Sequence, residues 1–134
     1  MTPEARFSAR VKAGLANCAI ERIENRVNLG IPDMLVGVGD RFVLVELKVL
    51  AKGLKVGLRP HQIAFMTRHA AKGRPCFVLL LDMGNTLRPS TIRLYSGDDA
   101  MKLATEGIKL DPLRCWPSRG MPWAELEETL GLVK

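Results

Sequence analysis

The stretch MLVGVGDRFVLVELKVL, residues 34–50, decides the fold of this chain. Two runs rich in valine and leucine flank the pair Gly39–Asp40, which is typical of the tight turn of a β-hairpin. We therefore predict strands over 34–38 and 42–50. In the second strand both alternating sets of positions are largely apolar, and this pattern indicates a central strand that is covered on both faces.

The second strand also carries two charges on one face. Glu46 and Lys48 are two residues apart, so their side chains point to the same side of the strand. Burying two such charges costs several kcal/mol unless they pair with each other or bind a metal. Asp33 stands at the start of the first strand, and the hairpin brings it toward the same end of the sheet. We expect two carboxylates and one ammonium to converge there.

This cluster has two interpretations. Mg²⁺ is a hard ion that binds a few carboxylate oxygens and keeps several waters. Such a metal lowers the pKa of a bound water and neutralises charge on a phosphate, while a lysine positions the water or stabilises the developing charge. This chemistry fits phosphodiester hydrolysis. The alternative is an ordinary cross-strand ion pair, and a Glu-x-Lys triplet taken alone favours this alternative because such triplets are common.

The chain after the hairpin predicts a loop, a helix and a further strand. Residues 51–59 contain two glycines and three basic side chains and indicate a basic loop. Pro60 opens a helix that ends at Gly73, its left-handed cap. Residues 76–81, CFVLLL, predict a strand that is buried on both faces. Because a helix joins two neighbouring strands here, the sheet is expected to be mixed rather than wholly antiparallel.

The chain before the hairpin predicts a helix and a charged strand. Thr2 is a capping residue followed by a proline, which indicates a helix from there to about residue 16. The four-residue spacing of Phe7, Val11 and Leu15 predicts its buried stripe. Residues 19–28 are expected to form a strand with a charged face, and their pattern leaves its register open.

The C-terminal quarter predicts mainly helices. We expect a strand over 91–95, a helix over 98–105 capped by Asp98, and a helix over 123–130. Residues 116–123 are expected to form a loop that wraps over the domain. Trp116 and Trp123 fit either the core or an interface between subunits.

The length and composition indicate a single folded domain. The chain has 134 residues, of which 47% are hydrophobic and 25% are charged, so it can bury one core and is not compositionally disordered. We find no repeat or Ser/Gly-rich linker. The expectation is one domain over 1–134, with a core over about 2–95 and a helical tail over about 98–134.

The spacing of the three cysteines and the length of the apolar runs indicate where in the cell the protein is expected to act. Cys18, Cys76 and Cys115 are far apart and match no disulfide or zinc spacing, so we expect buried free thiols. The longest apolar run, residues 76–81, is too short to cross a bilayer, and the chain has no signal-peptide pattern. The expectation is a cytoplasmic protein that does not interact with membranes.

The charge balance favours an anionic partner. The net charge is +6, and fifteen of the twenty Lys and Arg lie in residues 1–97, against seven of the fourteen Asp and Glu. A basic surface of this kind suits a nucleic acid. Because only 5% of the residues are aromatic, a platform that stacks single-stranded bases is not expected.

Three motifs in this order resemble a known group of nucleases. They are GIPD at 30–33, ELK at 46–48, and LRPHQ at 58–62. Together they resemble the PD-(D/E)XK nuclease superfamily and, within it, the compact VRR-NUC and phage Holliday junction resolvase-like branch. The resemblance covers about residues 2–82. It implies an α/β fold with a restriction-endonuclease-like core, in which helices flank a mixed central β-sheet.

The resemblance also implies roles for particular residues. Asp33 and Glu46 would bind Mg²⁺, with Mn²⁺ as its substitute, and the backbone carbonyl of Leu47 would be a further ligand. Lys48 would act on the attacking water. Gln62, near the start of the second helix, would help to hold the metal site or the DNA backbone, although a solvated amide fits the sequence equally well.

The family usually adds one acid from its first helix. Glu4 is the matching residue in this chain, and Glu24 is the rival because a strand next to the hairpin could aim it inward. We favour Glu4. Each of the two acids also fits an ordinary helix-dipole or salt-bridge role.

Basic residues outside the three motifs are candidates for phosphate contacts. Lys52 and Lys55 are the strongest candidates because their loop follows the central strand directly, and Arg59 and Arg26 are added to them. The alternative for each is a charge that serves solubility alone.

The function implied by the resemblance is a metal-dependent DNA endonuclease that acts on branched DNA such as Holliday junctions. Symmetric cutting of a four-way junction needs two active sites, so a homodimer is implied. The compact branch that the chain resembles suggests that the protein comes from a bacterium or a phage and acts in the cytoplasm of the bacterial or phage-infected host cell. The alternatives are a same-fold nuclease that cuts flaps, nicks or linear DNA, and a basic DNA-binding module or inactive relative without catalysis.

Overall fold

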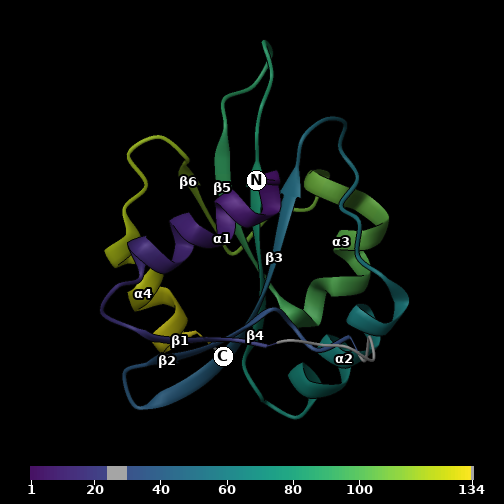
Figure 1. The fold of residues 1–134 in the computed structure, drawn as a ribbon. Helices are drawn as coiled ribbons and strands as arrows, with labels where there is room; N and C mark the ends of the chain where they lie inside the picture. Colours follow the sequence, from purple (N-terminus) through teal and green to yellow (C-terminus); the bar gives the residue numbers. More distant parts are fainter. Residues whose placement is uncertain (24–29, 134) are drawn as a thin grey trace.

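The computed structural model describes residues 1–23 and 30–133, and six strands of this part of the chain form one mixed sheet (Figure 1). Their order in the sheet is their order in the sequence. They are β1 (Ala19–Arg22), β2 (Met34–Val38), β3 (Arg41–Leu50), β4 (Cys76–Asp82), β5 (Thr91–Ser96) and β6 (Arg114–Pro117). Neighbouring strands are antiparallel except β3 and β4, which are parallel. The α/β class with a mixed sheet is therefore confirmed.

Helices cover both faces of the sheet (Figure 1). They are α1 (Pro3–Gly14), α2 (Pro60–Ala71), α3 (Ala100–Glu106) and α4 (Trp123–Leu132), with short 3-10 turns η1 (Gly97–Asp99) and η2 (Gly107–Lys109). Side chains of α1 and α4 pack with Val45 and Leu47 on one face of β3. Those of α2 and α3 pack with Leu44 and Leu50 on the other face. The central strand is thus buried on both sides, as its apolar pattern predicts.

The predicted cap and the predicted buried stripe are both present in helix α1. The Thr2 hydroxyl accepts a hydrogen bond from the Ala5 amide (3.1 Å), which satisfies one of the free N–H groups of the first turn. Phe7, Val11 and Leu15 are buried in the core. This helix therefore packs through the predicted stripe, and its first turn stays at the surface.

The hairpin and the crossover are also confirmed. β2 and β3 pair through a turn in which Gly39 has a φ of +61°, a conformation that favours glycine. Pro60 opens α2, and Gly73 follows its end with a φ of +74°. β4 then lies parallel to β3, with Glu46 opposite Val78. The β3–α2–β4 unit therefore holds the centre of the sheet.

Three expectations about the ends of elements change. β1 covers residues 19–22, and residues 24–28 of the predicted strand lie outside the described residues. Residues 114–117 form strand β6 where we expected a loop from residue 116. Asp98 does not cap α3: the Ser96 hydroxyl accepts from the Asp98 amide (3.2 Å) and caps η1, and α3 follows Asp99 without a side-chain cap bond.

Strand β6 places Trp116 in the core. The Trp116 ring is buried, and its Nε1 donates a hydrogen bond to Glu125 Oε2 of α4 (2.8 Å). Trp123 is partly buried and packs against the same core, with Gly14 of α1 at close approach. These contacts favour the core rather than the interface for both tryptophans.

The cysteines and the helix lengths complete the description. All three cysteines are free thiols: Cys76 is buried and Cys18 is half-buried, but Cys115 is exposed, which corrects the expectation of three buried thiols. Among the described residues, none of the helices has the length and apolar character that a bilayer crossing requires.

Candidate active site

The candidate site lies where β2 and β3 part. β2 begins at Met34, opposite Val45, whereas β3 continues to Leu50. From Glu46 onward, β3 pairs only with β4 in the part of the chain that the structure describes. This open edge is one wall of a cleft of about 1090 Å³, and the first turns of α1 and α2 contribute the others.

Asp33 contacts the open edge of β3 directly. Its Oδ2 accepts a hydrogen bond from the backbone amide of Leu47 (3.1 Å), so the carboxylate continues the pairing where β2 has ended. The N–H and C=O of one strand residue point to the same side. The Leu47 carbonyl therefore faces the same open edge as the Asp33 carboxylate, as a metal ligand at this position would have to.

Glu46 is the most buried charge of the cleft, with a residue exposure of 3%. Its Oε2 accepts a hydrogen bond from Gln62 Nε2 (2.9 Å) and lies 3.5 Å from Lys48 Nζ. Its Oε1 is buried and has no hydrogen-bond partner among the described residues. A buried carboxylate oxygen without a donor is costly in a folded protein, so its presence in a cleft favours a cation as its partner.

The surroundings of Glu46 also raise its pKa. Burial disfavours the charged carboxylate and is the largest cause, and the negative charge of Asp33 adds to it. The Lys48 ammonium lowers the pKa, but by less than the other two raise it, and the result is about 7. Strongly shifted carboxylates in clefts are typical of functional sites.

Gln62 reaches Glu46 because α2 begins close to the segment before Asp33. Gln62 Oε1 accepts from the Arg59 amide (3.0 Å), which fixes the side chain so that its amide nitrogen points at Glu46. Gly30 has a φ of +75°, and a Cβ there would lie 2.1 Å from the His61 carbonyl oxygen. Only glycine permits this approach.

The donor set fits Mg²⁺. Asp33, Glu46 and the Leu47 carbonyl offer hard oxygen ligands, and Mg²⁺ keeps water at its other positions. Glu4 lines the same cleft from the first turn of α1, and its rival Glu24 lies outside the described residues. Within residues 1–23 and 30–133, no three His, Cys, Asp or Glu side chains are close enough together to hold a metal by themselves.

The expected basic residues separate into two groups. Arg59 lines the cleft, whereas Lys52 and Lys55 are exposed on the loop between β3 and α2 and do not line it. Arg26 lies outside the described residues. Arg22 of β1 also lines the cleft; in the sequence it is one of several basic residues that are candidates for phosphate contacts.

Two hydroxyl residues of α1 are also part of the cleft wall. Thr2 and Ser8 line it, and Ser8 is buried. Thr2 is predictable as a helix cap, but the sequence carries no signal that either residue lines the cleft.

Comparison with known proteins gives a match by fold. Neither a protein-family model nor a curated protein sequence matches this chain. Among solved structures, the chain is similar to Hjc, a Holliday junction resolvase from the archaeal hyperthermophile Archaeoglobus fulgidus. The TM-score is 0.50 at 18% identity, and the match covers 69% of this chain and 76% of that chain. The fold is restriction-endonuclease-like.

That fold agrees with the architecture expected from the three motifs. The likeness to Hjc extends over most of both chains. At 18% identity the likeness concerns the fold. The roles of the cleft residues therefore rest on their own geometry and chemistry.

Proposed function

We propose that this chain is a metal-dependent DNA endonuclease that hydrolyses phosphodiester bonds, with a preference for branched DNA such as Holliday junctions. The observation that carries the proposal is the meeting of Asp33, Glu46 and Lys48 at the open edge of β3. A nuclease of this chemistry needs two carboxylates and a cationic side chain within reach of one phosphate.

Asp33, Glu46 and the Leu47 carbonyl would hold Mg²⁺, for which Mn²⁺ is the natural substitute. When bound, the metal supplies a more acidic water and neutralises charge on the phosphate. The buried, unpartnered Oε1 of Glu46 supports this assignment. Glu4, which lines the same cleft, is our choice for the additional acid.

Lys48 is the residue we assign to the attacking water. Its ammonium lies 3.5 Å from Glu46 Oε2, so it is held beside the carboxylates without being buried among them. From there it can donate a hydrogen bond to the water and stabilise negative charge on the phosphate. Gln62 is a positioning residue, because its amide holds Glu46 rather than the substrate.

Cations on the rim would hold the DNA. Arg59 and Arg22 line the cleft, and the net charge of +6 favours an anionic partner. Lys52 and Lys55 are assigned to phosphates farther from the scissile bond. Such contacts provide affinity without reading a base sequence.

The preference for branched DNA is supported by two resemblances. The three motifs resemble the VRR-NUC and phage resolvase-like branch, and the fold is similar to that of an archaeal Holliday junction resolvase. Paired cuts across a junction need two sites related by a two-fold axis, so we propose a homodimer.

The test is a cleavage assay on four labelled DNAs. An immobile four-way junction, a matched linear duplex, a single strand and a flap are each incubated with Mg²⁺, Mn²⁺ or EDTA. We expect paired nicks in the junction with either metal and none with EDTA. Lys48→Ala, purified in the same way, controls for a contaminating nuclease.

The other outcomes of this assay separate the alternatives. Cleavage of the flap or the linear duplex in preference to the junction would keep the chemistry and reject the branched substrate. Tight binding without cleavage, unaffected by EDTA, would overturn the nuclease and favour a basic DNA-binding module.

A further inference from the structure

Two loops project together beyond the ends of β3 and β4 (Figure 1). One joins β3 to α2 and covers residues 51–59, and the other joins β4 to β5 and covers residues 83–90. We call them the twin loops. Gly57 and Arg59 of the first loop line the cleft, so this loop is continuous with the candidate active site.

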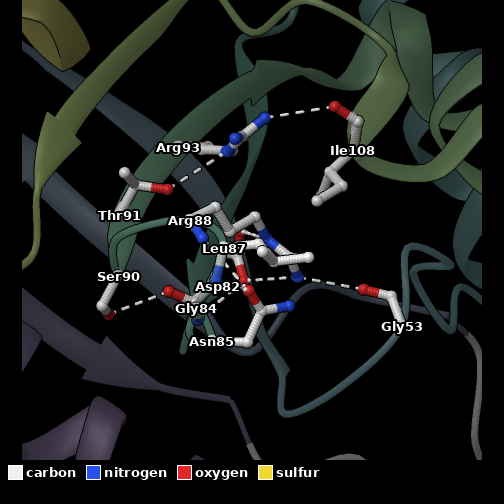
Figure 2. Close-up of polar contacts among 10 residues, drawn as sticks. All are labelled: Gly53, Asp82, Gly84, Asn85, Leu87, Arg88, Ser90, Thr91, Arg93 and Ile108. Carbon is white, nitrogen blue, oxygen red and sulfur yellow. Dashed lines mark hydrogen bonds and ion pairs between the residues drawn. The ribbon is translucent and has the colours of Figure 1, made fainter.

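A single arginine ties the twin loops to each other (Figure 2). Arg88 pairs with Asp82 at the end of β4, with Nε 2.8 Å from Oδ2 and Nη2 3.1 Å from Oδ1. The same Nη2 also donates to the backbone carbonyl of Gly53 in the other loop (3.0 Å). Asp82 is fully buried and the Arg88 side chain is 24% exposed, whereas the bond from Arg88 to Gly53 is exposed to solvent.

The electrostatics of Asp82 agree with a permanent contact. Burial by itself raises the pKa of the Asp82 carboxyl, but the hydrogen bonds from Arg88 and from the Gly84 amide, together with the charge of Arg88, outweigh it. The pKa is therefore held below its ordinary value. At neutral pH the Asp82 carboxylate therefore stays charged and maintains its ion pair with Arg88.

The tip of the second loop is also well ordered by hydrogen bonds. Asn85 Oδ1 accepts from the amides of Leu87 (2.7 Å) and Arg88 (3.1 Å). Gly84 has a φ of +72°, and a Cβ there would lie 2.7 Å from the Ser90 amide nitrogen. On this tight turn the Leu87 residue is 92% exposed. The fold thus presents a large apolar side chain to solvent on a backbone that has little freedom to bury it.

The first loop is held from its other side by η2. The Leu54 carbonyl accepts from the Ile108 amide (2.9 Å), and a Cβ at Gly107 would lie 2.0 Å from that carbonyl oxygen. Lys52 and Lys55 on either side of this anchor are exposed. Two cations are therefore displayed on the loop whose Gly53 carbonyl accepts from Arg88, the residue that follows Leu87.

The chemistry of this surface matches DNA. Residues 51–59 contain three basic side chains and no acidic one. Leu54 and Met83 are exposed in addition to Leu87, so the twin loops present apolar groups among cations. DNA offers the complement, an anionic backbone beside apolar base faces, and apolar wedges are used to open or kink base steps. A second copy of the chain is disfavoured because a symmetric contact would bring the lysines of both copies together.

We propose that the twin loops are a wedge for branched DNA, in which Lys52 and Lys55 hold phosphates and Leu87 packs against bases that are unstacked at the branch point. The proposal rests on the proposed function, whose site it extends. In this proposal the protein recognises an open base step of the substrate and does not recognise a base sequence.

The first test compares Leu87→Ala with Leu132→Ala. Leu132 of α4 is 72% exposed, so the control removes the same side chain from a surface outside the twin loops. Both changes are made in the Lys48→Ala protein, which keeps the DNA intact. We expect Leu87→Ala to weaken binding of a four-way junction about tenfold, in line with the loss of one base contact, while duplex binding changes less than about twofold. Leu132→Ala should change neither.

A fluorescent base gives a readout that affinity alone does not. With 2-aminopurine at the branch point, binding of the Leu87 protein should change the fluorescence of the unstacked base. Leu87→Ala should lose this change, and Leu87→Met, which keeps an apolar side chain of similar size, should restore it. An unchanged signal in Leu87→Ala would overturn the wedge.

The lysines are tested through the salt dependence of binding. Each phosphate contact contributes about 0.9 to the slope of log affinity against log salt. The double variant Lys52→Ala/Lys55→Ala should therefore lower that slope by about two. Lys12→Ala/Lys102→Ala, which removes two exposed lysines of α1 and α3, should leave it unchanged.

The outcomes distinguish the wedge from the nuclease. If the wild-type chain cuts the junction and Leu87→Ala binds and cuts it equally well, the wedge is wrong and the nuclease stands. If the wild-type chain cuts no DNA but the Leu87 and lysine effects on junction binding appear, the nuclease is wrong and the DNA surface stands. If Leu87→Ala instead turns a dimer into a monomer in sedimentation, the patch joins two copies and the proposal is overturned.

Discussion

Glu46 is expected to lower the stability of the metal-free protein at the pH at which it would bind the metal. In the metal-free protein its pKa is raised from 4.5 to about 7. Between these pH values the folded chain keeps a proton that the unfolded chain has lost, so the stability contributed by this proton falls as the pH rises and is lost above about pH 7. We expect Glu46→Gln to remove this slope and to stabilise the metal-free protein at pH 8, by about 3 kcal/mol at most.

The measurement is urea unfolding of both proteins in EDTA at pH 5 and pH 8. The quantity to compare is the difference in unfolding free energy between the variant and the wild type, because other groups titrate equally in both. Equal differences at the two pH values would show that Glu46 does not carry the raised pKa.

Lys48 separates catalysis from binding. Because one lysine is a small part of a multi-phosphate footprint, Lys48→Ala should keep DNA affinity within a few-fold of the wild type. Cleavage should fall by at least about a hundredfold, since the water and the phosphate lose their cationic partner. Single-turnover cleavage and binding in EDTA measure the two effects. A parallel collapse of affinity would mean that the assigned role is wrong.

At the scale of elements, α2 completes the site that the hairpin begins. The hairpin supplies Asp33, Glu46 and Lys48, and α2 supplies Gln62. The contact that joins the two is Gly30 against the His61 carbonyl. Any side chain at residue 30 would push the start of α2 away from Glu46.

Gly30→Ala therefore has two expected costs. It places a Cβ at a φ of +75° and against backbone atoms, so it should cost more than the roughly 1 kcal/mol of left-handed strain alone. Gly39→Ala is the matched control, because Gly39 has a φ of +61° and a Cβ there meets no atom within 4 Å. Thermal unfolding and junction cleavage check this prediction, and equal stability losses in the two variants would contradict the packing argument.

The sequence predicts elements well where a local signal decides them. The valine-rich hairpin, the proline that opens α2 and the apolar run of β4 are all found where their patterns place them. Strand β6 gives no such signal, because it has four residues, ends in proline and buries only Trp116. Its existence depends on pairing with β5, which is a tertiary contact.

The same distinction applies to the site. The convergence of Asp33 with Glu46 follows from a hairpin and is predictable. The hydrogen bond from Gln62 to Glu46 and the place of Arg22 in the cleft depend on how separate elements dock, so no spacing in the sequence shows them. The network of Asp82, Arg88 and Gly53 is unpredictable for the same reason.

At the scale of the whole molecule, the C-terminal quarter belongs to the same core as the first helix. Trp116, Leu126 and Leu130 pack in one cluster with Phe7 and Val45. We propose that residues 1–134 form one domain, which a single cooperative unfolding transition would test.

The proposed homodimer predicts the outcome of mixing subunits. Wild-type and Lys48→Ala chains are unfolded and refolded together, and the mixed dimer is isolated with two different tags. Because each subunit would cut one strand, the mixed dimer should nick a cruciform plasmid, whereas the wild-type dimer should linearise it. Gel electrophoresis of the plasmid reads out the result. Linear product from the mixed dimer would contradict one active site per strand.

The division of the site between a hairpin and a helix also affects how the protein fails on heating. Asp33 and Glu46 belong to a hairpin whose strands are adjacent in sequence, whereas Gln62 reaches them from a helix that starts after a nine-residue loop. Local opening of α2 disturbs fewer sheet contacts than melting of the hairpin, and proteins open first where the local free energy is lowest. If Gln62 positions Glu46 as proposed, a local opening of α2 separates these two side chains while the hairpin beside them stays paired.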